Sequence, residues 1–202
     1  MSPVKRQPLL FFCPRFGSFL RMQHSSVTVG PCDGHRGCVA DIAMLAKDIP
    51  LFPVDRSCYL ADLAEARLAS PHRIGWAAIF LKAYGKIVQE NPALRSWFLP
   101  GLWPRIATTK HNVATLAVNR TDNDHEQLYW ARLHQPETKS LVEIQRFIDN
   151  CRTGPIEELF KRQRELELLP GFLRKAVLRW NHRSGSHKRC SRIGTFSLST
   201  LA

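Results

Sequence analysis

The sequence lacks any uninterrupted run of about 18 apolar residues, the length that a membrane-spanning helix needs. It also lacks internal repeats, coiled-coil heptads and low-complexity blocks, which argues against solenoid, fibrous and composition-biased classes. We therefore predict no transmembrane segment. The 202 residues, 44% of them hydrophobic, are enough for one domain with a core of its own.

Acidic residues are scarce relative to basic ones. Against 29 Lys and Arg stand 17 Asp and Glu, so the net charge is +12. Ten basic and two acidic residues lie between 161 and 192, which gives that segment a net charge of +8. This balance favours an anionic partner: nucleic acid, a membrane surface or a phosphate-bearing small molecule. Nucleic-acid binding rests on the charge alone. No zinc-finger, homeodomain or RNA-recognition signature accompanies the charge, and we predict no nucleic-acid partner.

Cysteine is spread thinly and forms no paired clusters. Six Cys scattered along a chain of this length predict reduced thiols and a cytoplasmic protein. Only Cys32, His35 and Cys38 lie close together, and a closed zinc site needs a fourth ligand. We interpret these three residues as part of a glycine-rich loop that leads into a helix, and we predict no metal.

The first 35 residues differ from the rest of the chain. They contain no acidic residue before Asp33, and their short apolar run at 10–13 is broken by Pro14. That run is too short for a signal peptide, and the helical amphipathicity is too poor for a clear transit peptide. We predict that 1–35 is a disordered N-terminal tail, with a misplaced start as the alternative, and that the domain covers 36–202.

Apolar periodicity predicts most of the secondary structure. Spacings of three and four residues indicate helices, and alternation indicates strands. A Ser-x-x-Glu capping box at Ser140 begins one helix, which Gly154 and Pro155 end. We predict the other helices over 39–47, 60–67, 74–90 and 156–166, and strands over 111–120 and 128–133 joined by a polar turn.

The remaining segments are less regular. Residues 51–56 form a short extended segment, and 91–98 and 102–104 are predicted to be aromatic loops. Residues 172–180 are amphipathic and basic, and the surroundings of Gly185 suggest a mobile loop. In the helix over 74–90 we expect Tyr84 and Ile87 to share the core-facing side. Together these elements predict a mixed α/β (α+β) domain with helices on a sheet.

The last residues alternate in character. Phe196 and Leu198 point to one side of a predicted strand, whereas Thr195, Ser197 and Ser199 point to the other. The pattern follows Gly194 and gives the strand one apolar face and one hydroxyl face. We expect this strand to lie in the main sheet beside an unfilled position, with its hydroxyl face opening to a cleft or to solvent.

Five blocks of the sequence, taken in order, carry a resemblance to a known family. They are Asp-Ile-Pro at 48–50, Lys-Ala at 82–83, the strand that begins with His-Asn-Val at 111–113, the helix start at 139–144, and Gly-Thr-Phe-Ser-Leu-Ser at 194–199. In this order they resemble the catalytic domain of the acyltransferase component of 2-oxoacid dehydrogenase complexes (dihydrolipoamide acyltransferases). The resemblance covers about residues 36–202 and implies a two-layer sandwich like that of chloramphenicol acetyltransferase, with a mixed sheet covered by helices.

The resemblance implies an enzyme that transfers an acyl group between a thiol carrier and coenzyme A. In such a family a His is the general base, and a strand hydroxyl donates to the oxyanion of the tetrahedral intermediate. Ser199 falls at the position of that hydroxyl. The family's His-x-x-x-Asp-Gly motif is absent, because none of the eight His residues is followed by Asp at the fourth position. The domain is therefore either truncated before that motif or a degenerate, non-catalytic form.

Coenzyme A carries a 3′-phosphate and a pyrophosphate, and the basic segment could bind them. The candidates are Arg174, Lys175, Lys188 and Arg189. The resemblance further implies a homotrimer, in which a neighbouring subunit supplies the base, and an acyl-CoA or acyl-thioester substrate. The chain has no lipoyl attachment site. The alternative is a binding module with the acyltransferase fold that takes acyl-CoA, a protein or a membrane surface.

Overall fold

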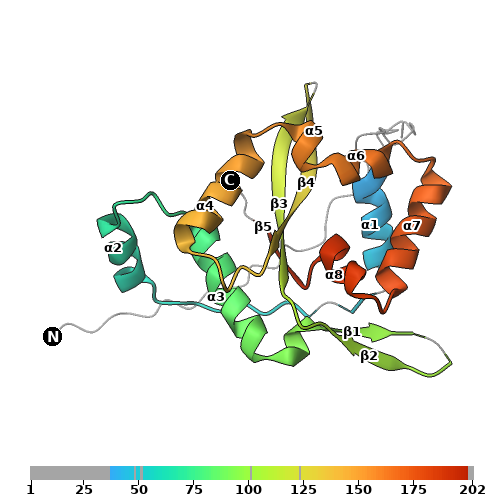
Figure 1. Cartoon of the computed structure of the whole chain (residues 1–202), viewed down its shortest axis with the longest axis horizontal. Helices are drawn as coiled ribbons and strands as arrows, with labels where there is room; N and C mark the ends of the chain where they lie inside the picture. The colour runs from blue at the N-terminus through green and yellow to red at the C-terminus, as the bar shows by residue number, and fades with distance from the viewer. Residues whose placement is uncertain (1–36, 48, 51, 101, 123, 200–202) are drawn as a thin grey trace, which may run out of the picture. The chain divides into compact units, whose positions relative to one another are not determined.

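The computed structural model describes residues 37–199 with the exception of 48, 51, 101 and 123. Every described residue belongs to one unit of the chain, 32–202. The predicted tail over 1–35 therefore lies outside the described residues. The described part is a mixed α/β structure, as predicted (Figure 1).

The main sheet has three strands in the order β4-β3-β5. β3 (Val113–Asp122) and β4 (His125–His134) form an antiparallel hairpin, which confirms the two predicted strands and the turn between them. β5 (Phe196–Ser199) pairs with β3 in parallel (Figure 1). Among the described residues, β5 is an edge strand of this sheet. A parallel pair needs a long crossover connection, and the helices between residues 141 and 193 supply it.

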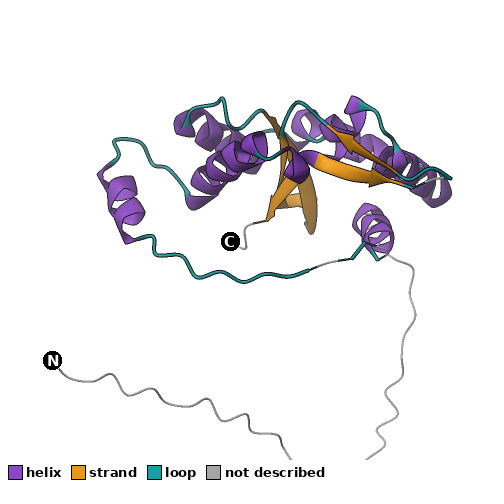
Figure 2. Ribbon diagram, turned by 90° about the horizontal axis from the view of Figure 1, so that it is seen from below, coloured by secondary structure: helices purple, strands orange, loops and turns teal. Residues whose placement is uncertain are grey.

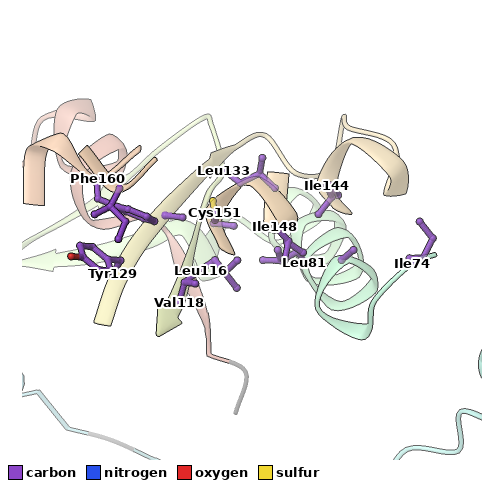
Figure 3. Close-up of a cluster of buried hydrophobic side chains, with 14 residues drawn as sticks. Ile74, Leu81, Leu116, Val118, Tyr129, Leu133, Ile144, Ile148, Cys151 and Phe160 are labelled. Carbon is purple, nitrogen blue, oxygen red and sulfur yellow. The ribbon is translucent and has the colours of Figure 1, made fainter. Parts of the chain in front are cut away.

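Two long helices cover one face of this sheet. α3 (Trp76–Glu90) and α4 (Leu141–Thr153) pack against each other and against the apolar residues of the strands. Figure 3 shows Leu81 of α3 and Ile148 of α4 among the strand side chains. The buried residues of this core are Ile74, Ala78, Leu81, Ala114, Leu116, Val118, Tyr129, Ala131, Leu133, Ile144, Ile148, Cys151, Ile156 and Phe160.

The buried stripe of α3 differs in part from the predicted one. Tyr84 and Ile87 were expected to face the core, but both are exposed, and Gly85 is buried in their place. The reason is a close approach to Pro136, whose Cγ would lie 2.8 Å from a Cβ placed on Gly85. Because the helix turns its glycine toward this contact, its aromatic neighbour Tyr84 lies at the margin of the core.

The start of α4 follows the sequence signal directly. The Ser140 hydroxyl accepts from the Glu143 backbone N–H at 3.2 Å, and the Glu143 carboxylate accepts from the Ser140 N–H at 2.7 Å. The Ser140 N–H and the Ser140 hydroxyl both donate to the Glu143 carboxylate and hold its pKa below the ordinary value, the backbone bond contributing most. At the other end, an Arg120 guanidinium nitrogen donates to the Gly154 carbonyl at 2.6 Å. The predicted capping box and helix break are thus confirmed.

Two sequence-based expectations need correction. Residues 91–98 are not simply a loop, because they contain a 3-10 helix and the first strand of a β-hairpin that forms a sheet of its own (strands are orange in Figure 2). Residues 102–104 lie in the loop between the two hairpin strands, as predicted. Residues 184–186 around Gly185 form a short connection without helix or strand, and a helix that was not predicted follows over 187–193. The helix expected over 156–166 is two helices, because Phe160 leaves the helical path and stacks on Tyr129 with ring centroids 4.7 Å apart. The described residues of the expected extended segment over 51–56 form neither helix nor strand, and the prediction of an extended chain there stays a prediction.

The smaller elements complete the described part. The helices are α1 (Gly37–Ala46), α2 (Ala61–Ala69), the 3-10 helix η2 (Pro92–Arg95), α5 (Ile156–Leu159), α6 (Lys161–Glu167), α7 (Gly171–Arg183) and α8 (His187–Ile193). The hairpin strands are β1 (Ser96–Leu99) and β2 (Arg105–Thr108). α1 and α2 confirm the predicted short helices, and α7 contains the predicted basic amphipathic segment.

Candidate functional site

The entry to β5 is held by backbone and hydroxyl contacts with β3. Gly194 has φ 91°, a left-handed conformation that favours glycine, and it ends α8. The Thr195 hydroxyl accepts from the Val113 N–H at 3.0 Å, and the Thr115 hydroxyl donates to the Ile193 carbonyl at 2.8 Å. The Gly-Thr pair thus fixes how the last strand joins the sheet.

Ser199 lies near the end of this edge strand. Phe196 and Leu198 pair in register with Ala114 and Leu116 and are half-buried on the core side. Ser197 and Ser199 pair with Thr115 and Ala117 and are exposed. The predicted alternation is therefore confirmed. The hydroxyl face opens to solvent, at the side of the sheet away from the α3–α4 core.

Arg174 is engaged in an ion pair with the first helix. Its Nε donates to Asp41 Oδ2 at 2.5 Å, and the two side chains are only 11% and 7% exposed. Lys175 lies 3.7 Å from the other oxygen of the same carboxylate, and its own side chain is largely exposed. Of these two predicted coenzyme A ligands on α7, Lys175 is therefore the one with a side chain open to solvent.

The other predicted pair lies at the start of α8. Lys188 is exposed, and its backbone N–H donates to the Ser186 hydroxyl that caps the helix. Arg189 is half-buried, with its guanidinium 4.6 Å from the centre of the Trp97 ring and its Nε donating to the His182 carbonyl at 3.1 Å. Burial lowers the pKa of Arg189 from its ordinary value.

The four basic residues form two pairs on consecutive helices that contact each other. The bond from Arg189 to His182 joins α8 to α7, and Arg192 Nη1 donates to Asn181 Oδ1 at the same junction. Within the described residues, none of the four basic side chains forms a hydrogen bond or ion pair with Ser199. Arg174 and Lys175 lie near the start of α7, whereas Lys188 and Arg189 lie beside its last turn, so the two pairs are near opposite ends of that helix. Ser199 is a separate feature at the sheet edge.

Two residues of this region carried no recognisable sequence signal. Trp97 on β1 stacks under Arg189 and donates from Nε1 to the Ser184 carbonyl at 3.1 Å. Asp41 on α1 pairs with Arg174 across 133 positions of sequence. Both contacts join segments that are distant in the chain, so no local pattern could have indicated them.

The buried thiols contribute no ready nucleophile. Burial raises the pKa of Cys38 and of Cys151 to about 11, so both remain protonated near neutral pH. Over the part of the chain that is described, no group of His, Cys, Asp and Glu has the arrangement of a metal site. Cys32 and His35 of the glycine-rich segment lie outside the described residues. Among the described cysteines, the exposed free thiol is that of Cys58, which precedes α2.

No protein-family model matches the chain, and no curated protein matches it. None of the described helices combines the length and the apolar character needed to cross a membrane.

Proposed function

We propose that this chain is a coenzyme A-dependent acyltransferase of the 2-oxoacid dehydrogenase acyltransferase family, with a chloramphenicol acetyltransferase-like domain over 36–202. It would transfer an acyl group between a thiol carrier and an acceptor. The observation that carries the proposal is β5, an edge strand that begins with Gly194 and Thr195 and leaves the Ser199 hydroxyl exposed. This is the element at which the resemblance places the oxyanion donor.

Ser199 would act on the tetrahedral intermediate. When a thiolate attacks the thioester carbonyl, a new C–S bond forms and the carbonyl electron pair moves onto oxygen. A hydroxyl donor held by a sheet strand stabilises that negative charge without reorganisation, and a donor of this kind is worth about 100-fold or more in rate. Collapse of the intermediate expels the other sulfur as the leaving thiolate. The general base for the attacking thiol would come from a neighbouring subunit of a homotrimer.

The exposed lysines would bind the phosphates of coenzyme A. Lys188 and Lys175 lie on the joined helices α8 and α7 with their side chains open to solvent. Arg174 and Arg189 are partly committed to Asp41 and to Trp97, so they would hold the helices in place as well as add positive potential. A cytoplasmic location, the absence of a metal and the absence of a lipoyl group on this chain belong to the same proposal.

A second candidate is a non-catalytic module of the same fold that binds acyl-CoA. The specific observation in its favour is that no His of the sequence is followed by Asp four residues later. A module of this kind would keep the coenzyme A contacts and need no base. The two candidates therefore share a binding step and differ in turnover.

Calorimetric titration with coenzyme A tests the shared step. We expect saturable binding that persists at raised salt, and weaker binding of dephospho-coenzyme A, which lacks the 3′-phosphate. A charge-assisted hydrogen bond contributes about 1.5–3 kcal/mol, so Lys188→Ala should weaken binding about tenfold or more. Lys86→Ala removes an exposed lysine from α3 and is the matched control.

The same titration can refute the assignment. Absence of any heat with the complete chain would remove coenzyme A as a ligand. Equal weakening by Lys188→Ala and Lys86→Ala, with full loss of binding at raised salt, would show that only the overall positive charge attracts the cofactor.

A further inference from the structure

Helix α7 buries polar side chains and exposes apolar ones, the reverse of an ordinary surface helix. Its one buried residue is Asn181, whose side chain accepts a hydrogen bond from Arg192. Arg174 faces inward as well and pairs with Asp41 of α1. Apart from the half-buried Leu178, the side chains that α7 turns inward are thus polar, and burial in the domain cannot explain the apolar residues that the helix exposes.

Those apolar residues line the outer side of the helix. Phe172 and Trp180 are 72% and 76% exposed, and Leu173 and Val177 are also exposed. Residues 172, 176 and 180, and residues 173 and 177, recur at intervals of four, so they form two adjacent rows along one face. In Figure 1, α7 lies beside α1 with no labelled helix or strand drawn beyond it. We call these rows the apolar face of α7.

A row of basic residues runs along one border of this face. Lys175, Arg179 and Arg183 also follow at intervals of four and are exposed, and no acidic residue occurs anywhere in the helix. The next helix, α8, adds three more basic residues, Lys188, Arg189 and Arg192. An exposed Trp and Phe next to a one-signed basic row is the arrangement that favours the boundary between lipid headgroups and acyl chains.

We propose that α7 lies in the surface of a lipid bilayer that contains anionic lipid, with Phe172 and Trp180 inserted among the acyl chains and the basic row on the headgroups. Charge complementarity selects this occupant. A second copy of the chain would bring another surface with the same positive row and the same net charge of +12 against this one. Anionic headgroups neutralise the row, and each basic residue near such a surface contributes to binding. The proposal does not depend on acyl transfer.

Vesicle co-sedimentation of the complete chain tests this proposal. We expect binding to phosphatidylcholine vesicles that contain 30% phosphatidylglycerol, weak binding to pure phosphatidylcholine, and loss of affinity as salt is raised. The double variant Phe172→Ser/Trp180→Ser should bind about tenfold or more weakly, because each ring withdraws a large apolar area from water on insertion. Arg179→Gln/Arg183→Gln should weaken binding about thirtyfold, from about 1 kcal/mol for each charge.

Matched variants separate this face from bulk properties. Phe52→Ser/Leu68→Ser removes two equally exposed apolar side chains elsewhere, and Arg73→Gln/Arg152→Gln makes the same change of net charge. Both controls should bind like the wild type. All the substituted side chains are exposed, and circular dichroism confirms that each variant is folded.

Three results would overturn the proposal. One is the absence of binding to anionic vesicles at low salt. Another is an equal loss of binding in the control variants, which would assign binding to total charge or total apolarity. The third is a stable oligomer that Phe172→Ser/Trp180→Ser dissociates, without vesicle binding by the wild type, which would make the apolar face of α7 an interface between copies. Coenzyme A binding is measured apart from vesicles, so its failure would leave this result unaffected.

Discussion

The ion pair between Asp41 and Arg174 should be a main determinant of how firmly α1 and α7 are joined. Both side chains are almost fully buried, and the Arg174 Nε donates to Asp41 Oδ2 at 2.5 Å. Removing one partner of such a pair leaves an unpaired charge in a poorly hydrated place. This costs about 3–5 kcal/mol, a large fraction of the stability of an ordinary domain. The exposed Lys175, 3.7 Å from the other oxygen, should contribute less than about 1 kcal/mol.

A double-mutant cycle measures the pair. We expect Asp41→Leu and Arg174→Leu each to lower the free energy of unfolding by about 3 kcal/mol. The double variant should cost less than the two single costs added together, because it leaves no charge unpaired. Urea denaturation followed by circular dichroism at pH 7 provides the three values. Single losses below about 1 kcal/mol, or a double variant that equals the added single losses, would refute a buried and coupled pair.

Two further predictions concern the strand entry and the buried thiols. Gly194→Ala should lower the free energy of unfolding by about 2 kcal/mol. The φ of 91° at this position disfavours a side chain, and the added Cβ would meet the Thr115 hydroxyl. An unchanged melting temperature would contradict this prediction. Cys38, whose pKa burial raises to about 11, should be alkylated far more slowly at pH 8 than the exposed Cys58. Peptide-resolved mass spectrometry should show the Cys38 rate rising about tenfold per pH unit from 8 to 10, and equal labelling of the two thiols at pH 8 would contradict the burial.

The elements that the sequence predicted correctly are those with a local signal. The β3–β4 hairpin follows from two alternating runs separated by a polar turn, and α4 follows from Ser140 and Glu143 three positions apart. β5 follows from the alternation after Gly194. In each case the residues that decide the structure lie within about one helical turn or one strand length of each other. The local sequence is therefore sufficient to predict the element.

The elements that the sequence missed depend on distant contacts. α8 is a helix of seven residues in a polar and basic stretch, and Arg189 holds it by donating to the His182 carbonyl of α7 and by lying over the Trp97 ring of β1. The β1–β2 hairpin has Trp97 bonded to Ser184, 87 positions away. The break between α5 and α6 comes from the packing of Phe160 on Tyr129. Tertiary packing overrides local propensity at each of these places.

The candidate site divides in the same way. The exposure of Ser199 could be predicted because it needs only the alternation of a strand and the edge position. The surroundings of the four basic residues could not be predicted, because Asp41 and Trp97 reach them from remote parts of the chain. The sequence identified the charges, and the fold decides which of them remain open to a ligand.

The central claim is that the Ser199 hydroxyl stabilises the oxyanion of acyl transfer. The most direct test measures acyl exchange between acetyl-coenzyme A and a dithiol acceptor, using the product of the complete reading frame that encodes this chain. We predict that Ser199→Ala lowers kcat about 100-fold or more with little change in KM, because the hydroxyl acts on the transition state. Ser197→Ala is the control, because Ser197 lies on the same face of the same strand but is assigned no catalytic role. Its kcat should stay within about twofold of the wild type. Equal effects of the two substitutions, or no exchange by the wild-type protein, would contradict the claim.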